Sequence, residues 1–300
     1  MHLFVGILSS VKKQIHYVFG NKSVKRKEVT TTFQSEYTKK VKETRKSLTE
    51  LHKKLCSIYG GDDVIKELMS LRGYTTKAMF DTLKDMGVFK VSYLSEISLV
   101  AKEYSNEQFK DFGLLTSEGD YLMPERYVLP IRDIKGEVIS LVGWHPNGGT
   151  RKYVTAPTIG FSRDTSFFNM DSFKLSWDKF DGAVYVVEGI FDTIALKSIG
   201  LPCYGNMGLE MGEIKSQMLT RHSKVVCIPD NDNAGRSVTP TLNSISGKSN
   251  KFIWDIKTDN VFVSLPKGVK DTDDLVKFFD CYEDLIKCLS VKVIKKIKED

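Results

Sequence analysis

The stretch VYVVEGIFDTIALKSIG, residues 184–200, decides the fold of this chain. Its first four residues are apolar or β-branched and show no helical period, which predicts a short buried strand. Glu188 ends the strand, Gly189 allows a tight turn, and Asp192 opens the following helix. The stretch therefore predicts one strand–turn–helix unit with an acidic turn.

A second such unit follows in KVVCIPDNDNAGRS, residues 224–237. Lys224 to Ile228 is the expected strand, and Asp230 and Asp232 stand in the loop after it. In an open α/β sheet, ligands bind beyond the carboxyl ends of the strands. We therefore expect both aspartates and Glu188 to meet at one edge, where a hard cation such as Mg²⁺ would find oxygen ligands.

These motifs, EG-x-x-D and D-x-D with AGR, resemble the TOPRIM fold shared by primases, topoisomerases and some nucleases. Four further segments resemble motifs of the bacterial-type replicative primases and stand in the same order as in that family. They are RYVLPIRDIKGEVISLVGW (126–144), RKYVTAP (151–157), FSRDTSFFNMD (161–171) and KGVKDTDDLVK (267–277). One such motif would be weak, but five in register are a specific signal.

The resemblance implies an α/β protein. It would have an α+β N-terminal lobe and a TOPRIM α/β domain with a mainly parallel central sheet flanked by helices. We predict a basic helical segment at 1–60, a basic mixed α/β lobe at 61–180, the metal-binding TOPRIM domain at 181–270, and a helical end at 271–300.

The function implied by the resemblance is that of a DNA primase. Such an enzyme is a nucleotidyltransferase that joins NTPs into short RNA primers on a single-stranded DNA template during replication. Mg²⁺, with Mn²⁺ as a substitute, would align the reactants and neutralise charge on the phosphoryl oxygens. The residues expected to hold metal are Glu188, Asp230 and Asp232, which are also the expected catalytic residues, and Asp192, Asp271 and Asp273 around a second ion. For Asp271 and Asp273 the alternative is helix capping, which is common for aspartate.

Basic residues at motif positions of the N-terminal lobe are expected to face template and nucleotide phosphates. They are Arg126, Arg132, Arg151 and Lys152. Trp144 stands where the family has an arginine. Tryptophan can stack on a base but cannot neutralise a phosphate, and the other interpretation is a core aromatic residue.

Two other functions remain open at this point. A TOPRIM nuclease would use the same acids to cut phosphodiesters, and a non-catalytic accessory protein would bind single-stranded DNA only. Bacterial members of the family dock on a replicative helicase through a further helical region. In this chain we expect the helicase contact to be absent or to be made in a different way. A primase core without a zinc ribbon and without a helicase-docking region suits a phage or a mobile element. We expect a cytoplasmic location, which would be the host cytoplasm if the chain is phage-encoded.

The N-terminal segment KKQIHYVFGNK (12–22) resembles the end of the family's zinc ribbon, but Val18 and Asn21 occupy the two cysteine positions. It is either a relic or a chance similarity, and we predict no bound zinc because a structural zinc site needs about four ligands. The five cysteines form no C-x-x-C pair, which favours a reducing compartment. The apolar start of the chain is too short to span a membrane, so no membrane partner is expected.

The charge is uneven along the chain. Residues 1–60 carry thirteen lysines and arginines against four glutamates, whereas the whole chain has a net charge of +6. A basic front half beside an acidic half suits an enzyme that holds both phosphate and cation, and the alternative is a solvated, lysine-rich surface. Apolar spacing predicts a helix over 35–60, and Asp62 is expected to cap the next helix. Residues 71–87 are predicted to form a further helix that ends at Gly87.

Overall fold

The computed structural model describes residues 26–100, 102–147, 151–208, 211–231, 260–277 and 290–292. Contacts divide the chain into two compact units, Met1–Glu43 and Thr44–Asp300. The ribbon-like segment 12–22, Asp232 and the helix expected after residue 281 lie outside the described residues. Among the described residues, no helix combines the length and the apolar character needed to cross a bilayer.

The helices are α2 (Arg26–Tyr59), α3 (Asp62–Arg72), α4 (Lys77–Met86), α5 (Leu94–Val100), α6 (Asn106–Asp111), α7 (Ser172–Lys179), α8 (Ile190–Ser198), α9 (Glu213–Leu219) and α11 (Thr272–Val276), with a 3₁₀ turn η2 (Arg163–Thr165). The strands are β1 (Phe89–Val91), β2 (Arg126–Arg132), β3 (Val138–Trp144), β4 (Tyr153–Thr155), β5 (Ala183–Val187), β6 (Cys203–Gly205), β7 (Lys224–Ile228), β8 (Asn260–Ser264) and β9 (Ser290–Lys292).

The helix predicted over 35–60 is confirmed as part of α2. Within the second unit, Leu48, Leu51 and Leu55 are fully buried, because their spacing of three and four residues places them on one face. Ile58 is 58% exposed and does not belong to that face. The expectation that Asp62 caps the next helix is wrong, since Gly61 occupies the N-cap and Asp62 is the first helical residue of α3.

The single helix predicted over 71–87 is also wrong, because a turn at 73–76 divides it. Gly73 adopts φ 72°, a left-handed conformation that ends α3. The Thr76 side chain then accepts a hydrogen bond from the Met79 backbone N–H at 3.2 Å and caps α4. The predicted end at Gly87 is confirmed. This turn carries Arg72 and Tyr74, which become important below.

The N-terminal lobe contains an antiparallel sheet with strand order β1-β2-β3-β4. The pair β2–β3 turns at Gly136, whose φ of 82° is a left-handed conformation that favours glycine. Tyr127 stands opposite Trp144 in this pair, so both aromatic rings lie at the same end of the sheet.

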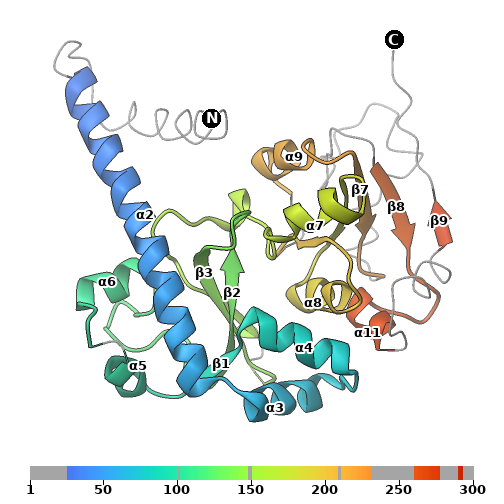
Figure 1. The fold of residues 1–300 in the computed structure, drawn as a ribbon, viewed down its shortest axis with the longest axis horizontal. Helices are drawn as coiled ribbons and strands as arrows, with labels where there is room; N and C mark the ends of the chain where they lie inside the picture. Colours follow the sequence, from blue (N-terminus) through green and yellow to red (C-terminus); the bar gives the residue numbers. More distant parts are fainter. Residues whose placement is uncertain are drawn as a thin grey trace. The chain divides into compact units, whose positions relative to one another are not determined.

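The second sheet has the order β6-β5-β7-β8-β9, in which the first four strands are parallel and β9 is antiparallel (Figure 1). Val184 and Val186 pack on one face with Leu219 of α9. Val187 packs on the other face with Ile194 of α8. Helices thus cover both faces of a mainly parallel sheet, and the predicted α/β fold is confirmed.

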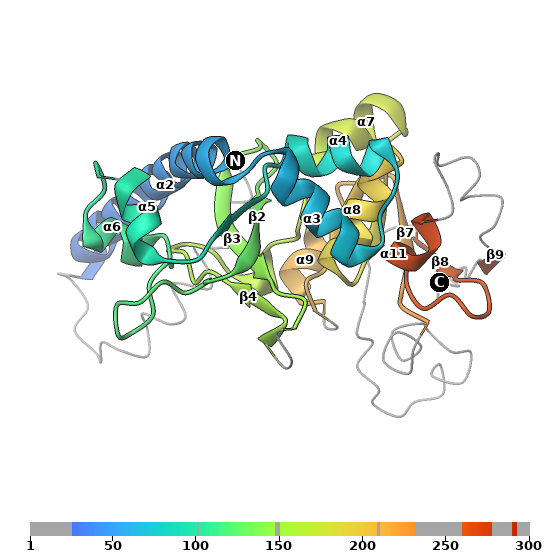
Figure 2. The same ribbon diagram turned by 90° about the horizontal axis from the view of Figure 1, so that it is seen from below.

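Helix α8 connects this domain to the N-terminal lobe. It lies beside α4 on one side and α11 on the other, as both ribbon views show (Figures 1 and 2). One hydrophobic core joins Leu129 of β2 and Val142 of β3 to Ile194 of α8 and Leu275 of α11. Because the lobe and the domain share this core, residues of both can form one site.

Candidate metal and nucleotide site

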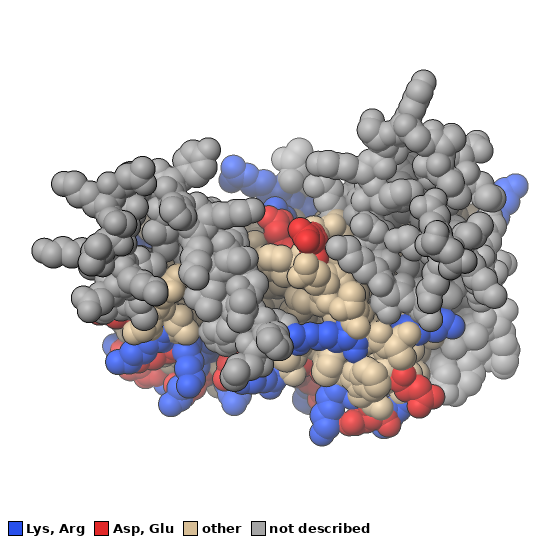
Figure 3. Space-filling view, turned by 90° about the horizontal axis from the view of Figure 1, so that it is seen from above, with Lys and Arg blue, Asp and Glu red and all other residues tan. Residues whose placement is uncertain are grey.

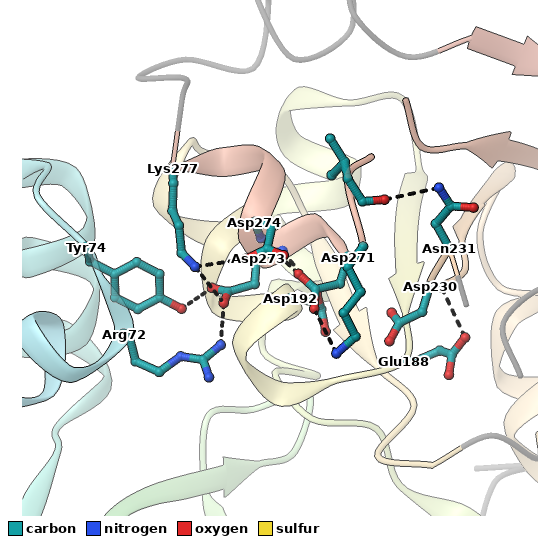
Figure 4. Close-up of polar contacts among 12 residues, drawn as sticks. Arg72, Tyr74, Glu188, Asp192, Asp230, Asn231, Asp271, Asp273, Asp274 and Lys277 are labelled. Carbon is teal, nitrogen blue, oxygen red and sulfur yellow. Dashed lines mark hydrogen bonds and ion pairs between the residues drawn. The ribbon is translucent and has the colours of Figure 1, made fainter. Parts of the chain in front are cut away.

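Glu188 and Asp230 lie at the carboxyl ends of β5 and β7, which are neighbouring parallel strands. The backbone N–H of Asp230 donates to Glu188 Oε1 at 3.1 Å (Figure 4). The parallel register brings these two acids together because Val187 stands opposite Ile228, the last residues of their strands. Two of the three predicted catalytic acids therefore meet, and Asp232 lies outside the described residues.

Asp192, in the first turn of α8, is 7% exposed. Its Oδ1 accepts a hydrogen bond from the Asp273 backbone N–H at 3.0 Å. Burial, together with the smaller effect of the charges of Asp230 and Asp271, raises the pKa of Asp192 to about 7. A Cβ added to Gly189 would lie 2.2 Å from Asp192 Oδ2, so glycine leaves the room that this carboxylate occupies.

The third group of acids belongs to α11. Asp271 is the N-cap, and its Oδ1 accepts from the Asp274 backbone N–H at 2.9 Å, so the capping interpretation is confirmed for this residue. Carboxylate oxygens of Asp271, Asp273 and Asp274 all lie within 4.8 Å of one another. Lys270 Nζ stands 3.6 Å from Asp271.

Asp273 is 2% exposed and accepts hydrogen bonds from Arg72 and Tyr74 of the N-terminal lobe. Sequence reasoning missed both partners. The signal was present in the motif LRG at 71–73, which resembles the start of the family's polymerase core, but the predicted continuous helix concealed the turn.

Asn231, between the two acids of the D-x-D motif, was also missed. Its backbone N–H donates to the Lys270 carbonyl at 2.6 Å. Its side-chain amide donates to the carbonyls of Val269, at 3.1 Å, and Pro266, at 3.4 Å. Asn231 therefore joins the loop after β7 to the segment that leads into α11 (Figure 4).

Lys152 is the predicted basic residue that reaches this acidic edge. Partial burial lowers the pKa of Lys152, as do the neighbouring Arg72 and Lys270, while Asp271 and Asp273 oppose the shift. Lys152 is therefore close enough to these charged groups for their electrostatic fields to act on it. Arg126 Nη1 donates to the Lys152 carbonyl at 3.2 Å and so supports the backbone from which Lys152 extends.

Two other predicted cations lie elsewhere. Arg151 is exposed beside Arg126, whose pKa is lowered by burial and then by Arg151. Arg132 stands at the far end of β2 from Arg126, six residues or about 20 Å along the strand. Its guanidinium donates to the carbonyls of Gly136, at 2.9 Å, and Met86, at 3.2 Å. These contacts give Arg132 a structural role, and its contact with a nucleotide phosphate stays a prediction.

The structure favours the interpretation of Trp144 as a core aromatic residue over its interpretation as a base-stacking residue. Its side chain is 2% exposed, and its ring lies 5.8 Å from that of Tyr127 and 5.1 Å from that of Phe191. The Arg72 guanidinium stands 5.5 Å from the indole centroid. An indole buried in this way offers no face to a nucleic-acid base, so the expectation that Trp144 stacks on the template is corrected.

Much of the described surface carries mixed charge. Basic side chains are interspersed with acidic ones along the lower edge of the face in Figure 3. Several surface lysines have acidic partners, as in Lys54–Glu103, Lys84–Asp62 at 2.9 Å and Lys90–Glu67 at 3.1 Å. These lysines fit the interpretation of the basic charge as a solvated, lysine-rich surface. Basic residues and buried acids come together instead at the edge near Lys152.

The donor set at the acidic edge suits a divalent metal ion. Oxygen ligands from carboxylates are what hard divalent cations prefer in proteins. Burial, and after it the charges of Asp230 and Asp271, raise the pKa of Asp192, and a cation beside this carboxylate would favour its charged form. Glu188, Asp230 and Asp192 supply carboxylate oxygens at this edge, and the carboxylates of Asp271, Asp273 and Asp274 form a second, close group beside them.

Comparison with known proteins agrees with this arrangement. Residues 185–276 match the family model described as Toprim-like. Over 155 residues the chain is 28% identical to the DNA primase of Synechococcus elongatus, covering 51% of this chain and 22% of that protein. The resemblance to bacterial-type DNA primases is confirmed. A second relative, the DNA primase of Clostridium acetobutylicum, is 26% identical over 183 residues, covering 59% of this chain and 29% of that one. The matched part is thus under a third of the length of these relatives.

Solved structures match the fold over most of the chain. A DnaG primase catalytic domain bound to single-stranded DNA superposes with a TM-score of 0.61 and 21% identity, covering 83% of this chain and 80% of that one. The zinc-binding and RNA polymerase domains of the Aquifex aeolicus primase give a TM-score of 0.63 and 22% identity, covering 81% and 60%. The chain therefore has the fold of the primase catalytic core.

Proposed function

We propose that this chain is a DNA-dependent RNA polymerase of the primase type, which joins NTPs into short RNA primers on single-stranded DNA. One observation carries the proposal most directly. The acidic edge formed by Glu188, Asp230 and Asp192 lies within electrostatic reach of Lys152, a cation of the N-terminal lobe. Joining nucleotides requires a cation site next to a phosphate site, and this edge offers groups for both.

Glu188, Asp230 and Asp192 would hold Mg²⁺, with Asp232 as a further candidate and Mn²⁺ as a substitute. When bound, the ion would neutralise charge on the phosphoryl oxygens and orient the attacking 3′-hydroxyl. The remaining roles belong to the chain itself. Lys152 would bind a phosphate of the incoming nucleotide as a point charge, and Arg126 would keep the Lys152 backbone in place.

The shared core supports a fixed geometry between these groups. Lys152 precedes β4 in the first sheet, whereas the acids follow strands of the second sheet. Packing of α8 against α4 and α11 fixes the two sheets relative to each other within one compact unit. Catalysis by positioning needs such rigidity, because a displacement of about 1 Å can cost a hundred-fold in rate.

A primer-synthesis assay tests the proposal. The purified chain is incubated with Mg²⁺, single-stranded DNA of mixed sequence and labelled NTPs, with a chelator in the control. We expect template-dependent RNA products, of dinucleotide length or longer, that disappear with the chelator. No incorporation would overturn the proposal. Cleavage of labelled DNA without incorporation would identify a nuclease, and DNA binding with neither activity would identify an accessory protein.

The absence of zinc and a contact with a replicative helicase stay predictions. Elemental analysis of the purified protein tests the first, and co-purification with a helicase tests the second.

A further inference from the structure

Three side chains contact or lie close to the carboxylate of Asp273 in α11. One carboxylate oxygen accepts from the Tyr74 hydroxyl and the other from Arg72 Nη2 (Figure 4). Lys277 Nζ stands 3.7 Å from the same carboxylate. Arg72 and Tyr74 come from the turn between α3 and α4, about two hundred residues earlier in the chain. The contact therefore joins the N-terminal lobe to the Toprim-like domain.

Arg72 is partly buried, and its guanidinium packs against aromatic rings. Its guanidinium lies 4.2 Å from the Phe191 ring centroid and 5.5 Å from that of Trp144. Burial alone would lower the pKa of Arg72, but Asp273 and Tyr74 beside it raise that pKa above its usual range. The guanidinium thus stays charged, and the aromatic walls restrict it to the direction of Asp273.

The charges around α11 are already balanced by protein groups. Asp273 has Arg72, Asp271 has Lys270 at 3.6 Å, and Asp274 has Lys277 at 2.9 Å. A metal ion on Asp273 would have to displace a buried guanidinium and a tyrosine hydroxyl. By contrast, Asp192 accepts a hydrogen bond from a neutral donor, the backbone N–H of Asp273.

We propose that Arg72 and Tyr74 are positioning residues that act through Asp273, and that Asp273 is a latch between the lobes rather than a metal ligand. By fixing α11, the latch fixes the Asp273 N–H, which directs the Asp192 carboxylate toward Glu188 and Asp230. The effect on primer synthesis rests on the proposed function, whereas the coupling between lobes does not.

The first measurement is Mn²⁺ binding by titration calorimetry on the full chain. Asp273→Asn should keep the wild-type number of bound ions, while Asp230→Asn should lose one ion or bind it at least about ten-fold more weakly. Tyr74→Phe should change the number of ions no more than Tyr59→Phe, a matched control whose hydroxyl donates to the Glu96 carbonyl within the N-terminal lobe. Loss of an ion in Asp273→Asn would overturn the proposal.

The second measurement is a double-mutant cycle on Tyr74→Phe and Asp273→Asn, read out as the midpoint of thermal unfolding and, separately, as the rate of primer synthesis. If Tyr74 acts through Asp273, the double variant should match Asp273→Asn alone in both readouts. Effects that simply combine would overturn the latch. If the wild type makes no primers, the proposed function fails, but the unfolding cycle and the Mn²⁺ titration still decide whether the latch exists.

Discussion

Asp192 and Asp273 are both buried aspartates, they lie next to each other, and their surroundings differ. Asp192 accepts from a neutral backbone N–H, and burial together with nearby Asp230 and Asp271 raises its pKa to about 7. Asp273 accepts from Arg72 and Tyr74, with Lys277 close by. Both carboxylates have carboxylate neighbours, but Asp273 also accepts a hydrogen bond from a guanidinium and has an ammonium group close by.

The difference shows that acids of a shared motif can serve different purposes. A carboxylate surrounded by carboxylates is destabilised until a cation arrives, so it favours metal binding. A carboxylate already paired with a buried guanidinium contributes to the arrangement of the lobes, and breaking the pair would leave an uncompensated charge. Burial and residue type are the same in both cases, and only the neighbours distinguish them.

The largest effect is expected for Asp230→Asn, which tests the metal-binding side of this comparison. The substitution keeps the size of the side chain but removes a negative charge beside Glu188. We expect primer synthesis to fall at least about a thousand-fold with an unchanged unfolding midpoint.

The matched control is Asp274→Asn, since the Asp274 side chain is 46% exposed and pairs with Lys277. It should change the rate no more than about two-fold, as surface ion pairs contribute little. Equal losses in the two variants would contradict the distinction between the two groups of acids.

Trp144→Ala tests the surroundings of the Arg72–Asp273 pair, because the indole packs against the Arg72 guanidinium. Removing a large buried aromatic ring should cost about 3–5 kcal/mol in the free energy of unfolding, measured by denaturant titration. Trp144→Phe should cost less, since it retains a ring against Phe191. Full stability of Trp144→Ala with weakened DNA binding would instead support the base-stacking role.

The fold could be predicted from sequence wherever the pattern was local. The strand β5 with its turn and helix α8, the strand β7, and the meeting of Glu188 with Asp230 follow from strand length, turn residues and the geometry of parallel sheets. The break at Gly73 was missed because the apolar spacing continues across it, and a left-handed glycine leaves no trace in such a pattern.

The roles of individual charges were harder to predict. Arg132 and Lys152 both stand at family motif positions, yet Arg132 holds backbone carbonyls at one end of β2 and Lys152 reaches the acids at the other. Likewise, nothing in the sequence pairs Asp273 with Arg72, since the two are brought together only by the packing of α4 and α11 on α8. Long-range pairing of this kind depends on tertiary structure.

The N-terminal lobe also contains a buried ionisable side chain, the imidazole of His52. It is 2% exposed, and burial, followed by Arg132, lowers its pKa to about 4. Because the pKa of His52 in the folded protein lies below the usual histidine value of 6.5, its contribution to stability should be complete above that pH and should fall as pH drops toward about 4. The loss from this residue should approach about 3 kcal/mol.

The measurement is the free energy of unfolding against pH. His52→Gln should flatten the curve between pH 6.5 and 4, leaving the share of His222, whose pKa burial also lowers to about 4. An unchanged curve would show that His52 is not held neutral by its surroundings.

The smallest effect is expected for Asn231→Ala, which tests the connection between the two groups of acids. The side-chain amide donates to Val269 and Pro266, so its removal should cost about 1–2 kcal/mol in the free energy of unfolding. Asn147→Ala, at an exposed position after β3, is the control. If the connection positions the acids, Asn231→Ala should also weaken Mn²⁺ binding several-fold, because the loop carrying Asp230 would no longer be fixed to the segment before Asp271. A loss of stability with unchanged Mn²⁺ affinity would show that the acidic edge keeps its arrangement without Asn231, and that the strands alone position Glu188 and Asp230.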